Sequence, residues 1–239
     1  DHAMLDTEAI RAEIDSPTYL AGLWHRTDAA MVDPARLAWG LQSAARSLGV
    51  VFHDNSPVCS IKRSGAGIEV QTDRGRVMAD RAVVATNAYR RPLSRIRRHV
   101  IPVYDHVLMT EPLSTDQWSA IGWGNRQGLS DAGNQFHYYR RTADGRILWG
   151  GYDIIYHFGG RVGPSVEHHA PTTRRLAQSF FHTFPQLGGL RFTHRWSGPI
   201  ASTTRFTCAW GTTHAGRVSW AAGYTGLGDG ASRVGARVA

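Results

Sequence analysis

The glycine-rich segment near the end of the sequence constrains the fold most strongly. Residues 217–222 read "RVSWAA", a strand pattern, and "GYTGLGDGAS" follows directly. Gly226, Gly228 and Ala231 match the G-x-G-x-x-G/A spacing of a strand, a tight turn and a helix. The free N–H groups of such a turn, together with the helix dipole, attract negative charge. The sequence contains no second strand or acidic residue about 20 positions further on, so the spacing alone also fits a purely structural glycine loop.

The composition is that of a globular protein. The 239 residues are 42% apolar and 19% charged, enough for one large or two small domains with a core. No apolar run approaches the roughly 20 residues that span a bilayer, and the polar start "DHAMLDTEAIRAEID" is not a signal peptide, so we expect no membrane contact. Cys59 and Cys208 form no disulfide framework, and we expect a cytoplasmic location.

The positive charge is carried almost entirely by arginine. The formal net charge is +8, Lys62 is the one lysine, and five arginines fall within "RRPLSRIRRH", residues 90–99. Such a cluster indicates either a patch that binds anions or an ordinary solvated loop. We favour the loop because no nucleic-acid motif or aromatic interleaving accompanies it, and we expect no nucleic-acid partner.

The first half of the chain predicts one helix and several strands. Asp33 is a good N-cap, Pro34 suits the first helical position, and Gly49 ends a helix over 33–49. Its apolar face is formed by Leu37, Leu41, Ala44 and Leu48. We then expect a short strand "VVFHD", a meander of "GIEVQT" and "RVMAD", and an apolar strand "RAVVAT". The last is too apolar for an exposed edge and predicts a parallel or mixed sheet, with Val83 and Val84 in the core.

The second half predicts antiparallel strands and one good helix. The strand in "HVIPVYDHVLMTEPL" contains Pro102, which favours an edge or a bend. "NQFHYYRRTADGRILWGGYD" predicts a hairpin that turns at "ADG". In "TRRLAQSFFHTF", Leu176, Phe180 and Phe184 have helical spacing and Pro185 ends the helix. We therefore expect an α+β fold.

Six stretches in order resemble the FAD-dependent amine and D-amino acid oxidoreductases, the family of glycine oxidase, sarcosine oxidase and gamma-glutamylputrescine oxidase. They are "MVDPARLAWGLQSAARSLGVVFHDNSPV", "RAVVATNAY", "IPVYDHVLMTEPL", "GRILWGGYD", "HRWSGPI" and "WAAGYTGLGDGAS". The resemblance implies a partial FAD-binding domain over 1–95 and a substrate domain over 96–216, a mostly antiparallel sheet with flanking helices. Residues 217–239 would return to the FAD-binding domain.

The resemblance also implies a role for the terminal glycines. In the family the dinucleotide loop lies at the N-terminus, before the point where this sequence begins, whereas the terminal turn lies under the isoalloxazine ring. Backbone donors there would stabilise negative charge on the ring. The implied FAD contacts are Val58, Ala85, Thr86, Asn87, Gly223, Tyr224, Thr225, Gly226, Leu227 and Gly228.

Substrate residues are implied less directly. His137, Tyr138 and Tyr139 fall where the substrate-facing strand of the family runs. Alternation places Tyr138 and Tyr139 on opposite faces, so at most one faces the ring, and ordinary sheet packing explains each equally well. Relatives acting on D-amino acids have an arginine two residues after the glycine of W-x-G, where this chain has Ile200. That difference favours an amine as substrate.

The implied activity is oxidation of a C–N bond of an amine or amino acid by hydride transfer to flavin N5, followed by hydrolysis of the imine. We name no catalytic side chain, and oxidase and dehydrogenase both stay open because Lys62 does not match the oxygen-activating lysine of some relatives. Cys208 does not match the spacing of covalent flavin attachment, and the histidines show no metal-ligand spacing.

Two expectations concern the chain by itself. Without the N-terminal unit for the ADP half of FAD, we expect weak or no FAD binding and no turnover. An alternative is a non-catalytic module that binds an anionic partner through the Arg90–Arg98 cluster. A third is an inactive relative, because Asp229 places an acid beside a turn suited to negative charge.

Overall fold

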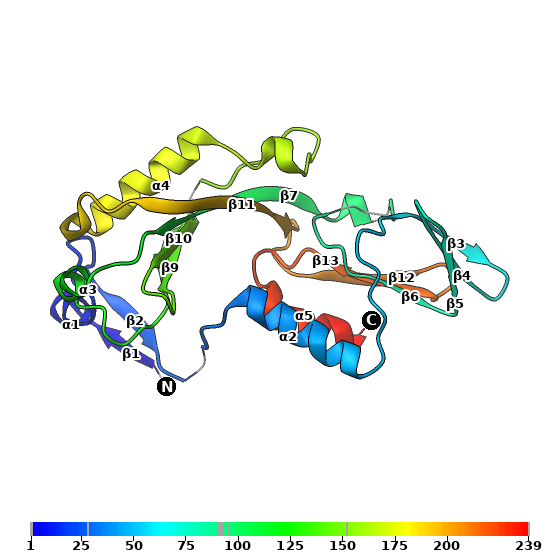
Figure 1. The fold of residues 1–239 in the computed structure, drawn as a ribbon, viewed down its shortest axis with the longest axis horizontal. Helices are drawn as coiled ribbons and strands as arrows, with labels where there is room; N and C mark the ends of the chain where they lie inside the picture. The colour runs from blue at the N-terminus through cyan, green and yellow to red at the C-terminus, as the bar shows by residue number, and fades with distance from the viewer. Residues whose placement is uncertain (1, 28, 90–92, 95, 152, 239) are drawn as a thin grey trace. The chain divides into compact units, whose positions relative to one another are not determined.

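The computed structural model describes residues 2–27, 29–89, 93–94, 96–151 and 153–238. The chain forms two compact units, which are described separately (Figure 1). Unit 1 comprises Asp1–Met31, Tyr104–Ile155 and Gly163–Gly198, and unit 2 comprises Val32–Val103, Tyr156–Val162 and Pro199–Ala239.

A five-stranded sheet of order β11-β7-β10-β9-β8 organises unit 1. Its strands are β7 (Ile101–Thr110), β8 (Leu129–Ser130), β9 (His137–Arg141), β10 (Ile147–Gly151) and β11 (Phe192–Ser202), of which β7 and β11 continue beyond the unit. The pairs β7–β10, β10–β9 and β9–β8 are antiparallel, which confirms the predicted hairpin and the mostly antiparallel sheet of the α+β class.

Helix α4 (Ala170–Thr183) supplies the core of unit 1 and runs along β11 in Figure 1. Leu176, Phe180 and Phe184 are fully buried, as their helical spacing predicts. They pack with Trp149 of β10, whose ring lies 5.5 Å from that of Phe180 at 86°. The helix ends at Thr183, and Pro185 opens the 3₁₀ turn η3 (Pro185–Leu187).

The N-terminal residues belong to unit 1, which differs from the predicted domain over 1–95. They form β1 (His2–Leu5), α1 (Thr7–Glu13) and β2 (Gly22–His25), and β1 pairs antiparallel with β2. The physical reason is burial: Ile14 lies in the same core as Trp149, and the Ser16 hydroxyl donates to the carbonyl oxygen of Thr183 at 2.6 Å. Helix α3 (Thr115–Ile121) completes this unit, with a capping box between Ser114 and Gln117.

Unit 2 contains two three-stranded sheets. The first is the predicted meander, β3 (Val58–Ser64), β4 (Gly67–Thr72) and β5 (Arg76–Ala79), paired antiparallel. The second has the order β12-β13-β6, with β12 (Ala209–Thr213), β13 (Val218–Ala222) and β6 (Ala82–Val84). Strands β13 and β6 are parallel, which confirms the mixed sheet predicted for "RAVVAT". Helices α2 (Pro34–Ser47) and α5 (Gly228–Val238) complete the unit, with short 3₁₀ turns at η1 (Ile96–Arg98) here and η2 (Pro164–Val166) in unit 1.

Helix α2 forms as predicted, but its apolar face is not buried. The Asp33 carboxylate accepts a hydrogen bond from the Arg36 amide at 3.1 Å, and Gly49 has a φ of +87°. Leu41 is 63% exposed and Leu48 is 85% exposed, and no residue of the helix is buried. The hydrophobic period therefore specifies the helix without providing a partner for it among the described residues.

Three other sequence expectations are corrected. Residues 50–54 form no strand, because within the described ranges no ladder partner pairs with them. Val83 is 64% exposed rather than in the core, because alternation along β6 turns Val84 toward the core and Val83 to the opposite face of the sheet. Strand β7 is not an edge, because it lies between β11 and β10. Among the described residues, β10 pairs with Val107–Met109, away from Pro102.

Candidate functional site

The glycine turn between β13 and α5 is held by a hydrogen bond from a neighbouring loop. The Gly223 amide donates to Oδ1 of Asn87 at 3.0 Å, which joins the loop after β6 to the start of the turn. Gly223 has a φ of +81°, and a Cβ there would overlap the methyl group of Thr203. This position therefore requires glycine both for its backbone angle and for its space.

Thr225 fixes the middle of the turn. It is a non-glycine residue with a φ of +52°, a strained conformation that surrounding contacts must hold. Its amide donates to the carbonyl oxygen of Ala201 at 2.9 Å, and its hydroxyl donates to the carbonyl oxygen of Gly223 at 3.1 Å. The Thr203 amide donates to the same hydroxyl at 3.4 Å, so β11 and the residue after it brace the turn.

The tip of the turn is open. Gly226 is exposed with a φ of +88°, and a Cβ built on it meets no atom within 4 Å. Within the described residues no group accepts a hydrogen bond from the Gly226 amide, and the Leu227 side chain is 70% exposed. Helix α5 begins two residues later and adds the positive end of its dipole. The turn is therefore braced at its base and presents an amide without an acceptor at its exposed tip.

The other residues predicted to contact FAD have different positions. Ala85 and Thr86 are exposed in the turn after β6, and the half-buried Asn87 joins them to Gly223. Val58 begins β3, an edge strand, next to a bulge between Val58 and Ser60. In the described part of the chain no hydrogen bond links Val58 to the glycine turn.

Tyr138 and Tyr139 lie on opposite faces of the unit 1 sheet. Tyr139 is 2% exposed, its ring lies 4.5 Å from that of Trp149, and its hydroxyl is 2.6 Å from that of Tyr19. This burial favours the packing interpretation for Tyr139. Tyr138 faces away from α4 and donates its hydroxyl hydrogen to Oδ2 of Asp105 at 2.6 Å.

Asp105, the hydrogen-bond partner of Tyr138, was not singled out by sequence reasoning. Burial raises the pKa of its carboxyl, although hydrogen bonds from Tyr138, His106 and Gly151 partly oppose the shift. Burial also raises the pKa of the Tyr138 hydroxyl, and the charge of Asp105 adds to the effect. The available signal was a single acid in the mostly apolar strand "IPVYDHVLMT".

His137 joins a second polar network in unit 1. Its Nδ1 lies 2.6 Å from Oδ2 of Asp131, and its Nε2 lies 2.9 Å from Oγ of Ser179 in α4. Burial alone raises the pKa of Asp131, but hydrogen bonds from His137 outweigh it and the pKa is lowered overall. The order Asp131, His137, Ser179 resembles the acid, base and nucleophile of a catalytic triad. However, Ser179 lies in mid-helix, where the neighbouring amides are engaged and cannot stabilise an oxyanion. The network instead ties the β8–β9 loop to α4.

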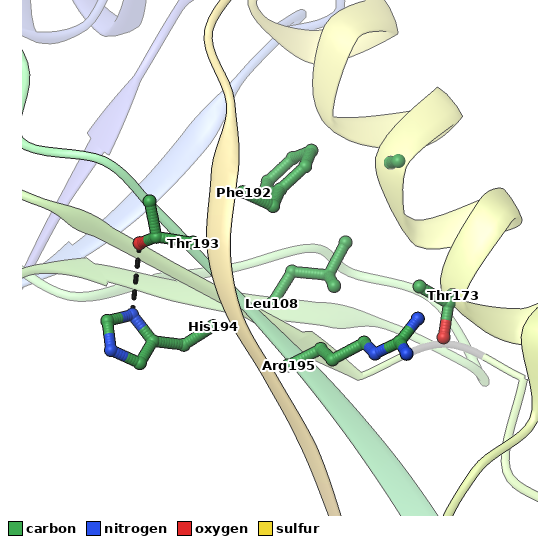
Figure 2. Close-up of a pocket in the computed structure, with 7 residues that line it drawn as sticks. Leu108, Thr173, Phe192, Thr193, His194 and Arg195 are labelled. Atoms are coloured by element: carbon green, nitrogen blue, oxygen red, sulfur yellow. Dashed lines mark hydrogen bonds between the residues drawn. The ribbon is translucent and has the colours of Figure 1, made fainter.

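A cavity of about 290 Å³ lies between α4 and β11 (Figure 2). Phe192 and Leu108 form its apolar part, while the guanidinium group of Arg195 points toward Thr173. His194 turns away and lies 3.0 Å from the Thr193 hydroxyl through Nδ1. None of the predicted site residues lines this cavity.

The remaining residues singled out in the sequence have the following positions. Cys208 is half-buried, with Sγ 3.4 Å from the carbonyl oxygen of Ala222, and Lys62 is exposed in β3. Arg90, Arg91 and Arg95 of the arginine cluster lie outside the described residues. Ile200 lies in β11, and the exposed Asp229 follows the first residue of α5.

The described residues contain neither a cluster of metal ligands nor a helix suited to crossing a membrane. In the ranges given above, no three His, Cys, Asp or Glu side chains gather as metal ligands. None of the helices described combines the length and the apolar character that crossing a bilayer requires.

Comparisons with known proteins identify relatives. The family model described as FAD dependent oxidoreductase matches residues 1–239. The chain is 32% identical over 202 residues to gamma-glutamylputrescine oxidoreductase of Escherichia coli, covering 84% of this chain and 45% of that protein. It is 28% identical to the probable oxidoreductase OrdL of Haemophilus influenzae, covering 93% of this chain and 49% of the relative. The chain thus spans about half the length of these curated relatives.

Solved structures share the fold. L-proline dehydrogenase from P. horikoshii superposes with a TM-score of 0.77 at 20% identity, covering 95% of this chain and 60% of that one. Glycine oxidase from Geobacillus kaustophilus gives a TM-score of 0.74 at 20% identity, covering 95% and 59%.

Proposed function

The chain belongs to the family of FAD-dependent oxidoreductases that includes these relatives, and from that premise we propose that the protein containing it oxidises a C–N bond of a small amine. The observation that carries the proposal is the glycine turn, which is braced from three sides and open at Gly226. When bound, FAD supplies the acceptor for the hydride that leaves the carbon bearing the amine.

The turn would hold the ring through its backbone. The Gly226 amide is an exposed donor, and α5 adds positive potential at the same end. Gly223 and Asn87 keep the turn in place through their 3.0 Å hydrogen bond, so the donor is preorganised. Contacts of Val58, Ala85, Thr86, Tyr224, Leu227 and Gly228 with FAD belong to the same proposal.

The two units would bind different ligands. Unit 2 would bind part of FAD, and unit 1 would bind the substrate through the sheet face that carries Tyr138. A further segment outside these 239 residues would bind the ADP half of the cofactor. Two observations support this: the chain covers 45% of the E. coli relative, and the apolar face of α2 is exposed. By itself the chain would bind FAD weakly and have no turnover.

The substrate would be an amine rather than an amino acid. Ile200 occupies the position at which D-amino acid relatives place a carboxylate-binding arginine. The relative with 32% identity is, by its name, an oxidoreductase of an amine, gamma-glutamylputrescine.

The test uses the native gene product that contains these residues. We expect the purified protein to carry FAD, and we expect its flavin absorbance to bleach when amines such as gamma-glutamylputrescine are added without oxygen. Glycine and proline should bleach it more slowly. Absence of bound flavin, or no bleaching by any amine or amino acid tried, would overturn the proposal.

A further inference from the structure

Asp105 of β7 is a carboxylate that no described cation neutralises. It lies on the face of the unit 1 sheet opposite α4, because Leu108 three residues later points into the core. The ion pairs of the described residues do not include it. Exposed acids are often unpaired, but Asp105 is partly buried, and at such a position an unpaired charge is costly.

The carboxylate has acceptor capacity left over. It accepts the Tyr138 hydroxyl at 2.6 Å and the His106 amide at 2.9 Å, and it also accepts the Gly151 amide. An ionised carboxylate offers about four acceptor positions, so three donors leave one position for a further hydrogen bond.

Tyr138 is held beside that position by the opposite strand. It pairs with Gly150 across β9 and β10, and a Cβ at Gly150 would lie 2.6 Å from the Tyr138 hydroxyl oxygen. The ring therefore lies over a position that only glycine can occupy. Because the hydroxyl donates its hydrogen to Asp105, its own oxygen remains an acceptor. The pair therefore offers two adjacent acceptors, one of them charged.

We propose that Asp105 and Tyr138 form a binding site for the ammonium group of an organic amine, with Asp105 as its counter-ion. The chemistry selects a cationic nitrogen with several N–H donors and repels a carboxylate. Burial raises the pKa of the Asp105 carboxyl, and a bound cation offsets that cost. The inference rests on the proposed function only where the bound amine is taken to be the substrate.

The experiment measures amine binding without flavin, so its result is independent of cofactor loading. The native gene product that contains these residues is freed of flavin and titrated calorimetrically with n-butylammonium and, separately, with butyrate, a matched anion of similar length. The variants are Asp105→Asn, which keeps an acceptor but removes the charge, and Tyr138→Phe. Asp144→Asn in the exposed β9–β10 turn is the control, because it removes the same charge from the same unit.

We expect the chain to bind butylammonium and not butyrate. Asp105→Asn should weaken binding about tenfold or more, Tyr138→Phe about threefold to tenfold, and Asp144→Asn should leave it unchanged. Equal binding by Asp105→Asn and the unchanged chain, or no preference for the cation, would overturn the inference. So would absence of binding. If Asp105→Asn does not fold, the comparison of butylammonium with butyrate on the unchanged chain still tests the inference. Bleaching of flavin by amines with no effect of Asp105→Asn would defeat this inference and leave the proposed function intact.

Discussion

Helices α2 and α4 are both 14 residues long and both amphipathic, yet only one of them is packed. In α4 the apolar stripe of Leu176 and Phe180 is fully buried against the unit 1 sheet. In α2 the stripe with Leu41 and Leu48 faces solvent. Local sequence therefore determines where a helix forms, whereas tertiary burial depends on which partners the chain provides. The apolar face of α4 has packing partners within unit 1. The apolar face of α2 has no such partner among the described residues.

The largest expected effect comes from the packed helix. Phe180→Ala removes a fully buried ring that contacts Trp149, Phe184 and Phe192. We expect a loss of about 3 to 5 kcal/mol in the free energy of unfolding. Chemical denaturation followed by tryptophan fluorescence measures it. A loss below about 1 kcal/mol would mean that α4 is not packed as described.

The hydrogen bonds that join Asp131, His137 and Ser179 of α4 should affect the pH dependence of stability. Because the pKa of Asp131 is lowered in the folded chain, its stabilising contribution is present above its unfolded value near 3.8 and is lost as pH falls through the folded pKa. Asp131→Asn should lower the free energy of unfolding by about 1 kcal/mol at neutral pH, with solvent screening allowed for. It should also make the free energy of unfolding depend less on pH in the acid range. Urea midpoints between pH 2 and 7 measure the difference, and parallel curves for the two proteins would contradict the assignment.

Asp105 should behave in the opposite sense. Its pKa is raised, so its contribution is fully present below pH 3.8 and is lost as pH rises through the folded pKa. Asp105→Asn should therefore gain stability relative to the unchanged chain as pH rises, by up to about 1 kcal/mol. The same urea series detects the gain. A gain that appears only at acid pH would reverse the sign and refute the burial argument.

The cap of α2 should matter less than the core of α4. Asp33→Ala removes the acceptor for the Arg36 amide, and we expect a cost of about 0.5 to 1 kcal/mol, confined to α2. Hydrogen exchange of the amides of α2 measures the local loss. A change in the exchange of α4 would show that the two helices are coupled.

The smallest effect is expected on the exposed face. Leu41→Lys should change the free energy of unfolding of the 239-residue chain by no more than about 0.5 kcal/mol, because the side chain is 63% exposed. The matched change Leu176→Lys in α4 should prevent folding of unit 1. Thermal melts of the two variants sharpen the comparison, and similar losses would show that the α2 face is covered in solution.

Much of the fold could be predicted from the sequence. Caps and periodicity located α2 and α4, and alternation with turn residues located the β9–β10 hairpin and the meander. Pairing between distant segments could not be predicted. Ile14 joins a core whose other buried members begin at Leu108, and among the described residues none pairs with the strand pattern of residues 50–54. The exposure of Val83 could not be predicted either, because the strand pattern does not say which faces of the sheet are covered.

The candidate site was predicted in part. Spacing located the glycine turn, and family order suggested Asn87 beside it, where its side chain binds the Gly223 amide. Alternation separated Tyr138 from Tyr139 but could not say which one faces the core. Asp105 escaped notice because its meaning depends on a cross-sheet contact with Tyr138, 33 positions away.

The most direct test of the central claim compares two glycines in the native gene product. Gly226 and Gly216 have φ angles of +88° and +80°, and a Cβ on either meets no atom within 4 Å. Gly226→Leu and Gly216→Leu should therefore strain the fold equally, and bound FAD per chain is measured from absorbance after purification. We expect Gly226→Leu to lose most of its flavin and Gly216→Leu to keep it. Equal flavin content in the two variants would contradict the role of the glycine turn as the seat of the flavin ring.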